Sequence, residues 1–270
     1  MKIGILTYHD GPNHGAFLQA YALMRNLEKR NNEVFVIDYK NKVHNKIEER
    51  SPFLRYKNPI RILDFYKKKK TFEKAHKKFR LTKRTTDPDI VRSEHFDRVI
   101  IGSDVVWNYK IFGLDELFYG DLNAERVISY APSFGWVNQS EKLPEGLGDR
   151  FKRFHSISAR DTNTQNIVKN TSGLDAELVL DPTLIYDFAK EEIEYPLPAG
   201  YRDYILVYAY KASPEVVRKA QLMAKEKKLK LIAVGYRQKW CDKVLMDVEP
   251  LQWLSLMRDA RYVITSTFHG

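Results

Sequence analysis

The end of the chain combines side chains that can supply a proton and hold an anion. Ser266, Thr267, Phe268, His269 and Gly270 directly follow an apolar run, which predicts a short buried strand at residues 262–265. Ligands of open α/β sheets bind at the carboxyl ends of the strands. Two hydroxyls, an imidazole and a glycine in this position predict a site for an anionic or hydroxylated ligand. The alternative is an ordinary turn at a strand end.

An early loop has the same relation to a predicted strand. Residues 2–7 predict a strand and residues 16–30 a helix, and the loop between them contains Asn13, His14 and Gly15. Such a loop presents backbone N–H groups to an anion at the start of the helix. The loop lacks the G-x-G-x-x-G pattern of dinucleotide-binding proteins. A tight strand-to-helix turn is the alternative.

Small and polar residues also follow the strand predicted at residues 96–101. Gly102, Ser103 and Asp104 come first, and Asn108 lies four positions later. This arrangement again places groups that bind hydroxyls where a parallel strand ends.

Arg160 lies between a short apolar stretch and a helix that Asp161 or Thr162 is placed to cap. An arginine at a strand end suits carboxylate or phosphate recognition, because its planar fork donates two parallel hydrogen bonds. An ion pair with Asp161 or another nearby acid is the alternative.

Several other chemistries lack their sequence signatures. The histidines are scattered, and no group of His, Cys and Asp has the spacing of metal ligands, so no metal is expected. There is no P-loop, no G-x-S-x-G and no internal repeat. The single cysteine, Cys241, excludes an internal disulfide. No apolar stretch approaches the roughly 20 residues that cross a bilayer, so a cytoplasmic protein is expected.

The positive charge is concentrated in one segment. Residues 40–84 carry a net charge of +13, whereas the rest of the chain carries −3. This argues against a nucleic-acid partner, whose basic footprint follows a recognisable fold. The second half of the segment predicts one amphipathic helix with a cationic outer face. That face is either simply solvated or attracted to an anionic acceptor or a membrane surface, as peripheral contact through residues 40–84.

Strands and helices alternate along the chain in two runs. The pattern predicts an α/β fold of two Rossmann-like domains facing a cleft. The first domain is expected at residues 1–185, with a basic helical insertion around 40–84, and an acidic, proline-containing linker at 186–203. Residues 204–270 predict the start of the second domain. Only three strands are expected there, so this domain is expected to be incomplete at its C-terminal end and to continue beyond Gly270.

Six phrases of the sequence together resemble the polysaccharide pyruvyl transferase family. They follow the family's order and span nearly the whole chain: GILTYHDGPNHGAFLQAYAL (4–23), IIGSDVVWN (100–108), SYAPSFG (129–135), SISARDTN (156–163), LVLDPTLI (178–185) and LMRDARYVITSTFHG (256–270). The basic segment at 40–84 shows no clear match. One departure is His14, where many relatives have tyrosine, which leaves the role of the first loop in acceptor choice open.

The resemblance implies a glycosyltransferase-B-like fold and a reaction. It implies transfer of a pyruvyl group from phosphoenolpyruvate, as donor substrate and without a cofactor, to two hydroxyls of a sugar or lipid-linked saccharide, giving a cyclic ketal. It also implies His269 as general acid and Arg160 as a ligand of the donor's anionic groups. The first domain is then the expected acceptor side and the second the expected donor side.

Site residues are expected on both sides. Those on the donor side are Arg160, Ser266, Thr267 and Gly270, and those on the acceptor side are Asn13, His14, Gly15, Gly102, Ser103, Asp104 and Asn108. Two other functions stay open: a glycosyltransferase that uses a nucleotide sugar, and a non-catalytic sugar- or anion-binding protein on the same scaffold.

Overall fold

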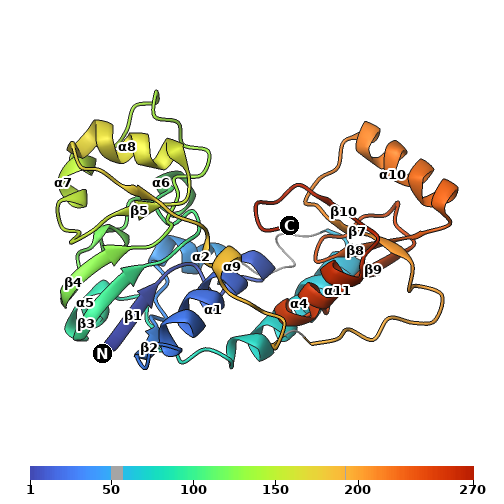
Figure 1. Ribbon diagram of the computed structural model, residues 1–270, viewed down its shortest axis with the longest axis horizontal. Coiled ribbons are helices and arrows are strands. Elements are labelled where there is room, and N and C mark those ends of the chain that lie inside the picture. Colours follow the sequence, from blue (N-terminus) through green and yellow to red (C-terminus); the bar gives the residue numbers. More distant parts are fainter. Residues whose placement is uncertain (50–56, 192) are drawn as a thin grey trace. The chain divides into compact units, whose positions relative to one another are not determined.

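The computed structural model describes residues 1–49, 57–191 and 193–270 (Figure 1). The described chain divides into two compact units. The first comprises residues 1–10, 19–49 and 78–186, and the second comprises residues 11–18, 57–77, 187–191 and 193–270. The division at Tyr186 lies next to the start of the predicted linker. Residues 11–18 belong to the second unit, although the segments before and after them belong to the first. The sequence pattern does not predict this division.

The first unit is built on a parallel sheet with strand order β2-β1-β3-β4. Its strands are β1 (Lys2–Leu6), β2 (Glu33–Val36), β3 (Phe96–Ile101) and β4 (Ala124–Ser129). Strands of a parallel sheet covered on both faces are mostly apolar, and this explains the runs from which β1 and β3 were predicted, whereas β4 carries the exposed Glu125 and Arg126. A second parallel pair joins β5 (Ser158–Ala159) to β6 (Glu177–Leu178).

Short helices connect these strands. They are α1 (His14–Glu28), α2 (Lys42–Glu49), α5 (Pro88–Ser93), α6 (Tyr109–Phe112), the 3-10 helix η1 (Glu116–Tyr119), α7 (Leu147–Phe151), α8 (Thr162–Ser172) and α9 (Pro182–Ile185). The predicted cap of α8 is confirmed, because Asp161 Oδ1 accepts from Thr164 N at 2.7 Å. The first five residues of α1 belong to the second unit and the rest to the first.

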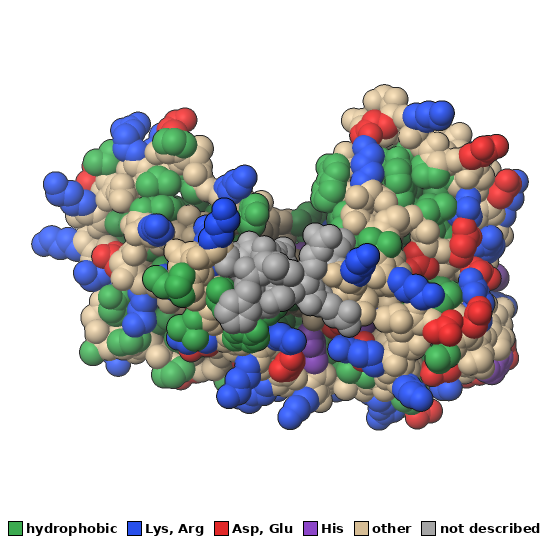
Figure 2. Space-filling model, turned by 180° about the vertical axis from the view of Figure 1, so that it is seen from behind, with side chains coloured by type: hydrophobic (Ala, Val, Ile, Leu, Met, Phe, Trp, Pro, Cys, Tyr) green, Lys and Arg blue, Asp and Glu red, His purple; other side chains and the backbone are tan. Residues whose placement is uncertain are grey.

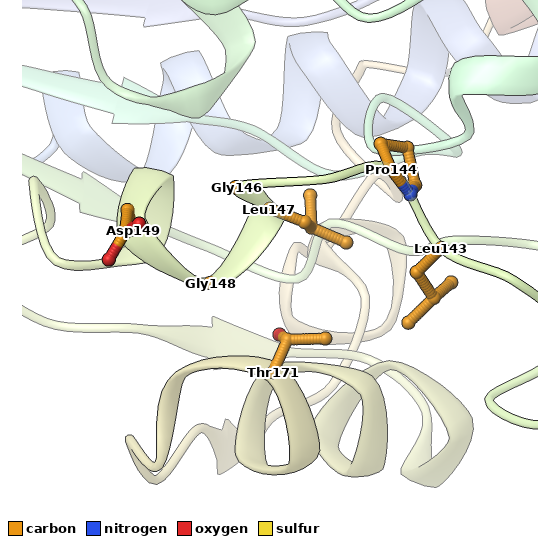
Figure 3. Close-up of a pocket in the computed structure, with 7 residues that line it drawn as sticks. All are labelled: Leu143, Pro144, Gly146, Leu147, Gly148, Asp149 and Thr171. Atoms are coloured by element: carbon orange, nitrogen blue, oxygen red, sulfur yellow. The ribbon is translucent and has the colours of Figure 1, made fainter.

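Helices α7 and α8 pass unusually close to one another (Figure 3). A Cβ atom added to Gly148 of α7 would lie 1.9 Å from the carbonyl oxygen of Thr171 in α8. Only glycine fits that position. Beside it lies a cavity of about 370 Å³, lined mainly by Leu143, Pro144 and backbone of α7. Among the described residues that line this cavity, Asp149 alone is ionisable, so the cavity offers little chemistry.

The second unit is a parallel sheet with strand order β10-β7-β8-β9. Its strands are β7 (Tyr204–Tyr208), β8 (Lys230–Val234), β9 (Lys243–Leu245) and β10 (Tyr262–Thr265), and its helices are α4 (Pro59–His76), α10 (Pro214–Lys227) and α11 (Pro250–Asp259). Ser213 caps α10, because its Oγ accepts a hydrogen bond from Val216 N.

Helices α10 and α11 cover opposite faces of this sheet, since side chains of a strand alternate between the faces. Ile205 and Val207 pack toward Ala220 and Ala224 of α10. On the other face, the Tyr208 ring lies 4.8 Å from the Trp253 ring of α11. Helix α4 lies beside α11 (Figure 1), and Lys74 Nζ of α4 is 2.6 Å from Glu249 Oε1 at the start of α11.

The structure corrects the prediction for the basic segment. The described parts of residues 40–84 form two helices, α2 in the first unit and α4 in the second, so they are not one insertion into the first domain. Residues 50–56 lie outside the described residues. The inner face of α4 is also less apolar than predicted, because it carries the buried Asp64 as well as Phe72.

Strand β10 is a second difference. It has the predicted bounds, but Tyr262 and Val263 are exposed. It lies at the edge of the sheet, where it pairs with β7 alone. Lysines and arginines lie scattered over much of the surface that Figure 2 shows. No helix among the described residues is long and apolar enough to span a membrane.

Candidate functional site

Two clusters of candidate residues lie at the carboxyl edges of the two parallel sheets. We call them the second-unit cluster (His14, Gly15, Lys68, Tyr208, Tyr236 and His269) and the first-unit cluster (Ser103, Asp104, Arg160 and Asp181). Both edges are the places where ligands bind in α/β sheets.

His269 lies against the first turn of α1. A Cβ atom added to Gly15 would fall 2.4 Å from His269 Nδ1 and 2.6 Å from its Cγ. The bare backbone of Gly15 is therefore what allows the imidazole to occupy this place. The predicted loop residue Gly15 and the predicted acid His269 thus belong to one cluster, although 254 residues separate them.

The residues around His269 hold the end of the chain in a tight turn. Thr267 N donates to Thr265 Oγ1 at 3.1 Å, and the two threonine hydroxyls are 3.2 Å apart. A Cβ atom on Gly270 would lie 2.9 Å from Tyr208 Cδ1 and closer still to Thr265. Ser266 is exposed. Thr267 and Gly270 therefore shape the turn in this structure.

His14 is a buried, neutral histidine that is hydrogen-bonded within the second unit. It is 1% exposed, and its Nε2 donates to the carbonyl of Val248 at 3.0 Å. With that nitrogen protonated, Nδ1 is the acceptor for the Tyr208 hydroxyl at 3.3 Å. Burial, together with the charge of Lys68, lowers the pKa of His14 to about 3. Both ring nitrogens therefore have protein partners, and the ring stays neutral at physiological pH.

Asn13 precedes α1 and caps it. Its Oδ1 accepts from Gly15 N at 2.9 Å and from Ala16 N at 3.3 Å. This is the contact pattern of a helix N-cap, and it corresponds to the structural alternative for this loop. It also orients the backbone on which the His269 ring rests.

Lys68 of α4 joins the same cluster. Its Nζ donates to the carbonyl of Gly235 at 3.1 Å, directly after β8, and lies 4.8 Å from the centre of the Tyr236 ring. Burial lowers the pKa of Lys68 to about 8. Lys68 was not predicted from the sequence, because it is one of four consecutive lysines and nothing local distinguishes it.

The first-unit cluster is a buried charge network. Arg160 Nη1 donates to Asp181 Oδ2 at 2.9 Å and to Ser103 Oγ at 3.2 Å, and Nη2 lies 3.7 Å from Asp104 Oδ1. The Arg160 side chain is 5% exposed. Its ion-pair partners are thus Asp181 and Asp104, whereas Asp161 caps α8. Asp181 was visible in the phrase LVLDPTLI but was not predicted as a site residue.

Gly102 and Asn108 flank the first-unit cluster. A Cβ on Gly102 would approach Thr7 Cβ to 3.0 Å, so Gly102 permits close packing of β1 and β3. Asn108 is buried and caps α6 through its Oδ1, which accepts from Lys110 N. Its Nδ2 is buried without a hydrogen-bond partner among the described residues.

A second charge network in the first unit was not predicted from the sequence. Asp10 Oδ2 lies 2.6 Å from Lys40 Nζ, and Asp38 Oδ2 lies 3.0 Å from Arg84 Nε. Burial alone would raise the pKa of Asp38, but hydrogen bonds from His9 and Arg84 hold it below its ordinary value. The charges in this network are balanced, which is the usual condition of buried ion pairs.

One group of residues has the donor atoms of a metal site, but it lies elsewhere. Within the described ranges, His95, Asp97 and Glu125 have ligand atoms within 4.8 Å of one another at the amino ends of β3 and β4. Asp97 Oδ2 accepts from Lys2 N at 2.7 Å, and Glu125 Oε2 lies 3.5 Å from Arg98 Nη1. The carboxylates therefore already have cationic or N–H partners.

The chain was compared with known proteins in three ways. The model of the polysaccharide pyruvyl transferase family matches residues 13–270. Among solved structures, the chain is similar to the E. coli heptosyltransferase WaaC with ADP-2-deoxy-2-fluoro heptose, with 9% identity, a TM-score of 0.44, and coverage of 98% of this chain and 82% of that chain. The same enzyme with ADP gives 10% identity and a TM-score of 0.43, covering 98% and 81%.

No match was found among curated proteins. The family model spans nearly the whole chain, including the loop of Asn13 and the closing motif of His269, and so includes residues of both clusters. The chain therefore belongs to the polysaccharide pyruvyl transferase family.

Proposed function

We propose that this protein transfers a pyruvyl group from phosphoenolpyruvate to two hydroxyls of a sugar in a cell-surface polysaccharide or its precursor, forming a cyclic ketal. The observation that supports the proposal best is the position of His269, at the carboxyl edge of the second sheet and against the bare backbone of Gly15. A histidine in that position can act as a general acid, and family membership indicates the group that is transferred.

The reaction requires one acid and two departures of hydroxyl protons. His269 donates its proton to the methylene carbon of phosphoenolpyruvate, which becomes the methyl group and leaves an oxocarbenium-like centre at the neighbouring carbon. One sugar oxygen forms a bond to that centre and loses its proton, which restores His269. The second sugar oxygen then replaces the phosphate, and its proton leaves with the inorganic phosphate. No other reactant is needed to balance these steps.

Within the first-unit cluster, Asp104 is proposed to serve the acceptor. The Asp104 side chain is 15% exposed, whereas that of Asp181 is 1% exposed. Asp104 is therefore the carboxylate that can accept a hydrogen bond from a sugar hydroxyl. Arg160 remains a proposed ligand for an anionic group, held in place by Asp181 and Ser103. Arg160→Lys should then weaken phosphoenolpyruvate binding about ten- to a hundredfold, and an unchanged Kd would leave it as an ion-pair residue.

His269 gives the decisive experiment. The protein is incubated with phosphoenolpyruvate and a panel of saccharides, and phosphate release and ketal formation are followed by a phosphate assay and mass spectrometry. His269→Ala should lower turnover about 10²- to 10⁴-fold, the usual contribution of a general acid. His155→Ala is the control, because His155 is an exposed histidine of the first unit.

His269→Gln separates proton donation from simple binding. Glutamine donates a hydrogen bond but supplies no proton, so this variant should bind phosphoenolpyruvate better than His269→Ala and turn over no faster. Recovery of most of the turnover in His269→Gln would exclude the general-acid role. Binding of nucleotide sugars without binding of phosphoenolpyruvate would replace the proposal with a glycosyltransferase.

A further inference from the structure

Lys68 is a cation whose charge has no counterpart among the described residues of the second unit. Its ammonium has three N–H donors. Among the described residues it makes one hydrogen bond, to the carbonyl of Gly235, and faces the rings of Tyr236 and Phe72 at 4.8 and 5.9 Å. No carboxylate in the described part of the chain forms an ion pair with it.

Two other charges on α4, Asp64 and Lys74, have partners of opposite charge. Asp64, one turn before Lys68, is bound by Arg237 through two contacts, one of them 2.8 Å between Nη2 and Oδ1. Lys74 pairs with Glu249 at 2.6 Å. The nearest acid to Lys68 in the sequence of α4 is thus already neutralised, and α4 is fixed to the second unit on both sides of Lys68.

An unpaired cation in such surroundings is costly. Removing an ammonium from water is unfavourable unless an opposite charge or several acceptors replace the water. Burial accordingly lowers the pKa of Lys68 to about 8, and no neighbouring carboxylate raises it again. A methionine in this position would pack against Tyr236 and Phe72 without that cost, so lysine here calls for a role outside the stability of the unit.

Lys68 lies beside the turn that follows β8 and beside the Tyr236 ring. Gly235, in the left-handed region at φ +69°, turns the chain directly after β8. The rings of Tyr208 and Tyr236 lie 5.3 Å apart. His14 lies next to Gly235, because a Cβ on that glycine would be 3.1 Å from His14 Cε1. This is the carboxyl edge of β7 and β8, the same edge at which His269 follows β10.

We propose that Lys68 binds an anionic group of the donor substrate, a phosphate or carboxylate, at the carboxyl edge of the second sheet. This assignment rests on the proposed function for the identity of the donor. It also gives part of the basic segment a definite role. Lys68 is partly buried and binds the anion, whereas the other lysines of α4 are exposed. His14 stays neutral and acts as a positioning residue for Tyr208 and Gly235.

The test compares two methionine variants of adjacent lysines. Lys68→Met keeps an unbranched side chain that is one atom shorter and removes the charge. Lys69→Met makes the same change at an exposed position, where the side chain of Lys69 is 57% exposed. Binding of inorganic phosphate and of phosphoenolpyruvate is measured by titration calorimetry. Lys68→Met should weaken both about ten- to a hundredfold, the effect of losing a charged hydrogen bond, and Lys69→Met should leave both within about twofold.

Thermal unfolding without ligand adds a second readout. Lys68→Met should unfold at the same temperature as the parent protein or higher, because the charge of a partly buried ammonium is gone, and should lose the rise in Tm that phosphate or phosphoenolpyruvate gives the parent protein. A lower Tm together with unchanged binding would show that Lys68 only supports the fold, through Gly235 and Tyr236, and would overturn the inference.

The outcomes distinguish this inference from the proposed function. If the parent protein binds phosphoenolpyruvate and Lys68→Met binds it equally well, the inference fails and the proposed function stands. If the parent protein binds phosphate but not phosphoenolpyruvate, and Lys68→Met loses phosphate, the anion site stands and the proposed donor is wrong. If the parent protein binds neither, both fail.

Discussion

Gly15→Ala is the change that tests the geometry of the second-unit cluster most directly. Gly15 is the second residue of α1, and its Cα–Cβ direction points into the ring of His269. A Cβ atom there would lie 2.4, 2.6 and 2.8 Å from Nδ1, Cγ and Cβ of His269. Three atoms of one side chain are approached at once, so the clash cannot be relieved by rotating the end of a flexible chain.

The size of the effect follows from these distances. Non-bonded heavy atoms rest at about 3.5–4.0 Å, so the imidazole has to move by about 1 Å. Displacement of a catalytic group by about 1 Å costs roughly a hundredfold in rate. Alanine is at the same time a better helix former than glycine, by up to about 1 kcal/mol. Gly15→Ala is therefore expected to lose about a hundredfold in turnover without a lower Tm.

A double-mutant cycle with His269→Ala identifies the cause. In the His269→Ala protein the ring that Gly15→Ala would displace is absent, so adding Gly15→Ala should cost almost nothing more in turnover. Turnover is measured as acceptor-dependent phosphate release, and Tm by circular dichroism. Full activity of Gly15→Ala, or a further hundredfold loss when it is added to His269→Ala, would refute the contact between this backbone and the ring.

Four further outcomes are expected. The pKa of His14 is about 3 in the folded chain and its ordinary value is 6.5. Below pH 6.5 the unfolded chain therefore takes up a proton that the folded chain refuses, and stability falls by about 2 kcal/mol from this residue at pH 5; an NMR signal of His14 that titrates near pH 6.5 would contradict this. Lys68 loses its charge as the pH rises through about 8, while His14 is already neutral and burial raises the pKa of Tyr208 and of Tyr236. Asp64 and Arg237 are paired with one another. Phosphoenolpyruvate should therefore bind more weakly at pH 9 than at pH 7 in the parent protein, and this pH dependence of binding should be absent in Lys68→Met. Gly148→Ala should lower the Tm of the first unit, because overpacking costs about 1–3 kcal/mol or more; an unchanged Tm would mean that α7 and α8 separate freely. If the outer face of α4 meets anionic lipid, charge removal at Lys67, Lys69 and Lys70 together should reduce sedimentation with phosphatidylserine vesicles at low salt, with little effect at high salt; equal sedimentation would identify a solvated face.

Much of the fold follows from local sequence patterns. The bounds of β3 and β10 agree with the apolar runs from which they were predicted, and Ser213 and Asp161 cap the helices that they precede. These features depend on residues a few positions apart, in which apolar periodicity and capping chemistry act directly. A parallel α/β class with two sheets was predictable on the same basis.

The candidate site was predictable in position but not in contacts. His14 was expected in a loop that binds the acceptor, and it is buried with Tyr208 and Val248, 194 and 234 residues away, as its two partners. Lys68 was hidden in a run of four lysines, because the rotation of α4 is set by the contact of Asp64 with Arg237, 173 residues away. No local pattern contains information on such long-range pairs.

The two bases of the second-unit cluster illustrate how one environment assigns different charges. Burial disfavours the cationic form of both His14 and Lys68, and it lowers the pKa of each. The ordinary pKa of histidine is close to neutral pH, and each ring nitrogen of neutral His14 has a hydrogen-bond partner, so His14 remains uncharged. The ordinary pKa of lysine is much higher, so Lys68 keeps its charge at pH 7. Its ammonium also has N–H donors left after its hydrogen bond to the carbonyl of Gly235. A donor anion at this edge would restore the missing counter-charge and raise the pKa of Lys68 again. Anion binding and charge on Lys68 therefore reinforce one another, and the proton for the chemistry is left to His269.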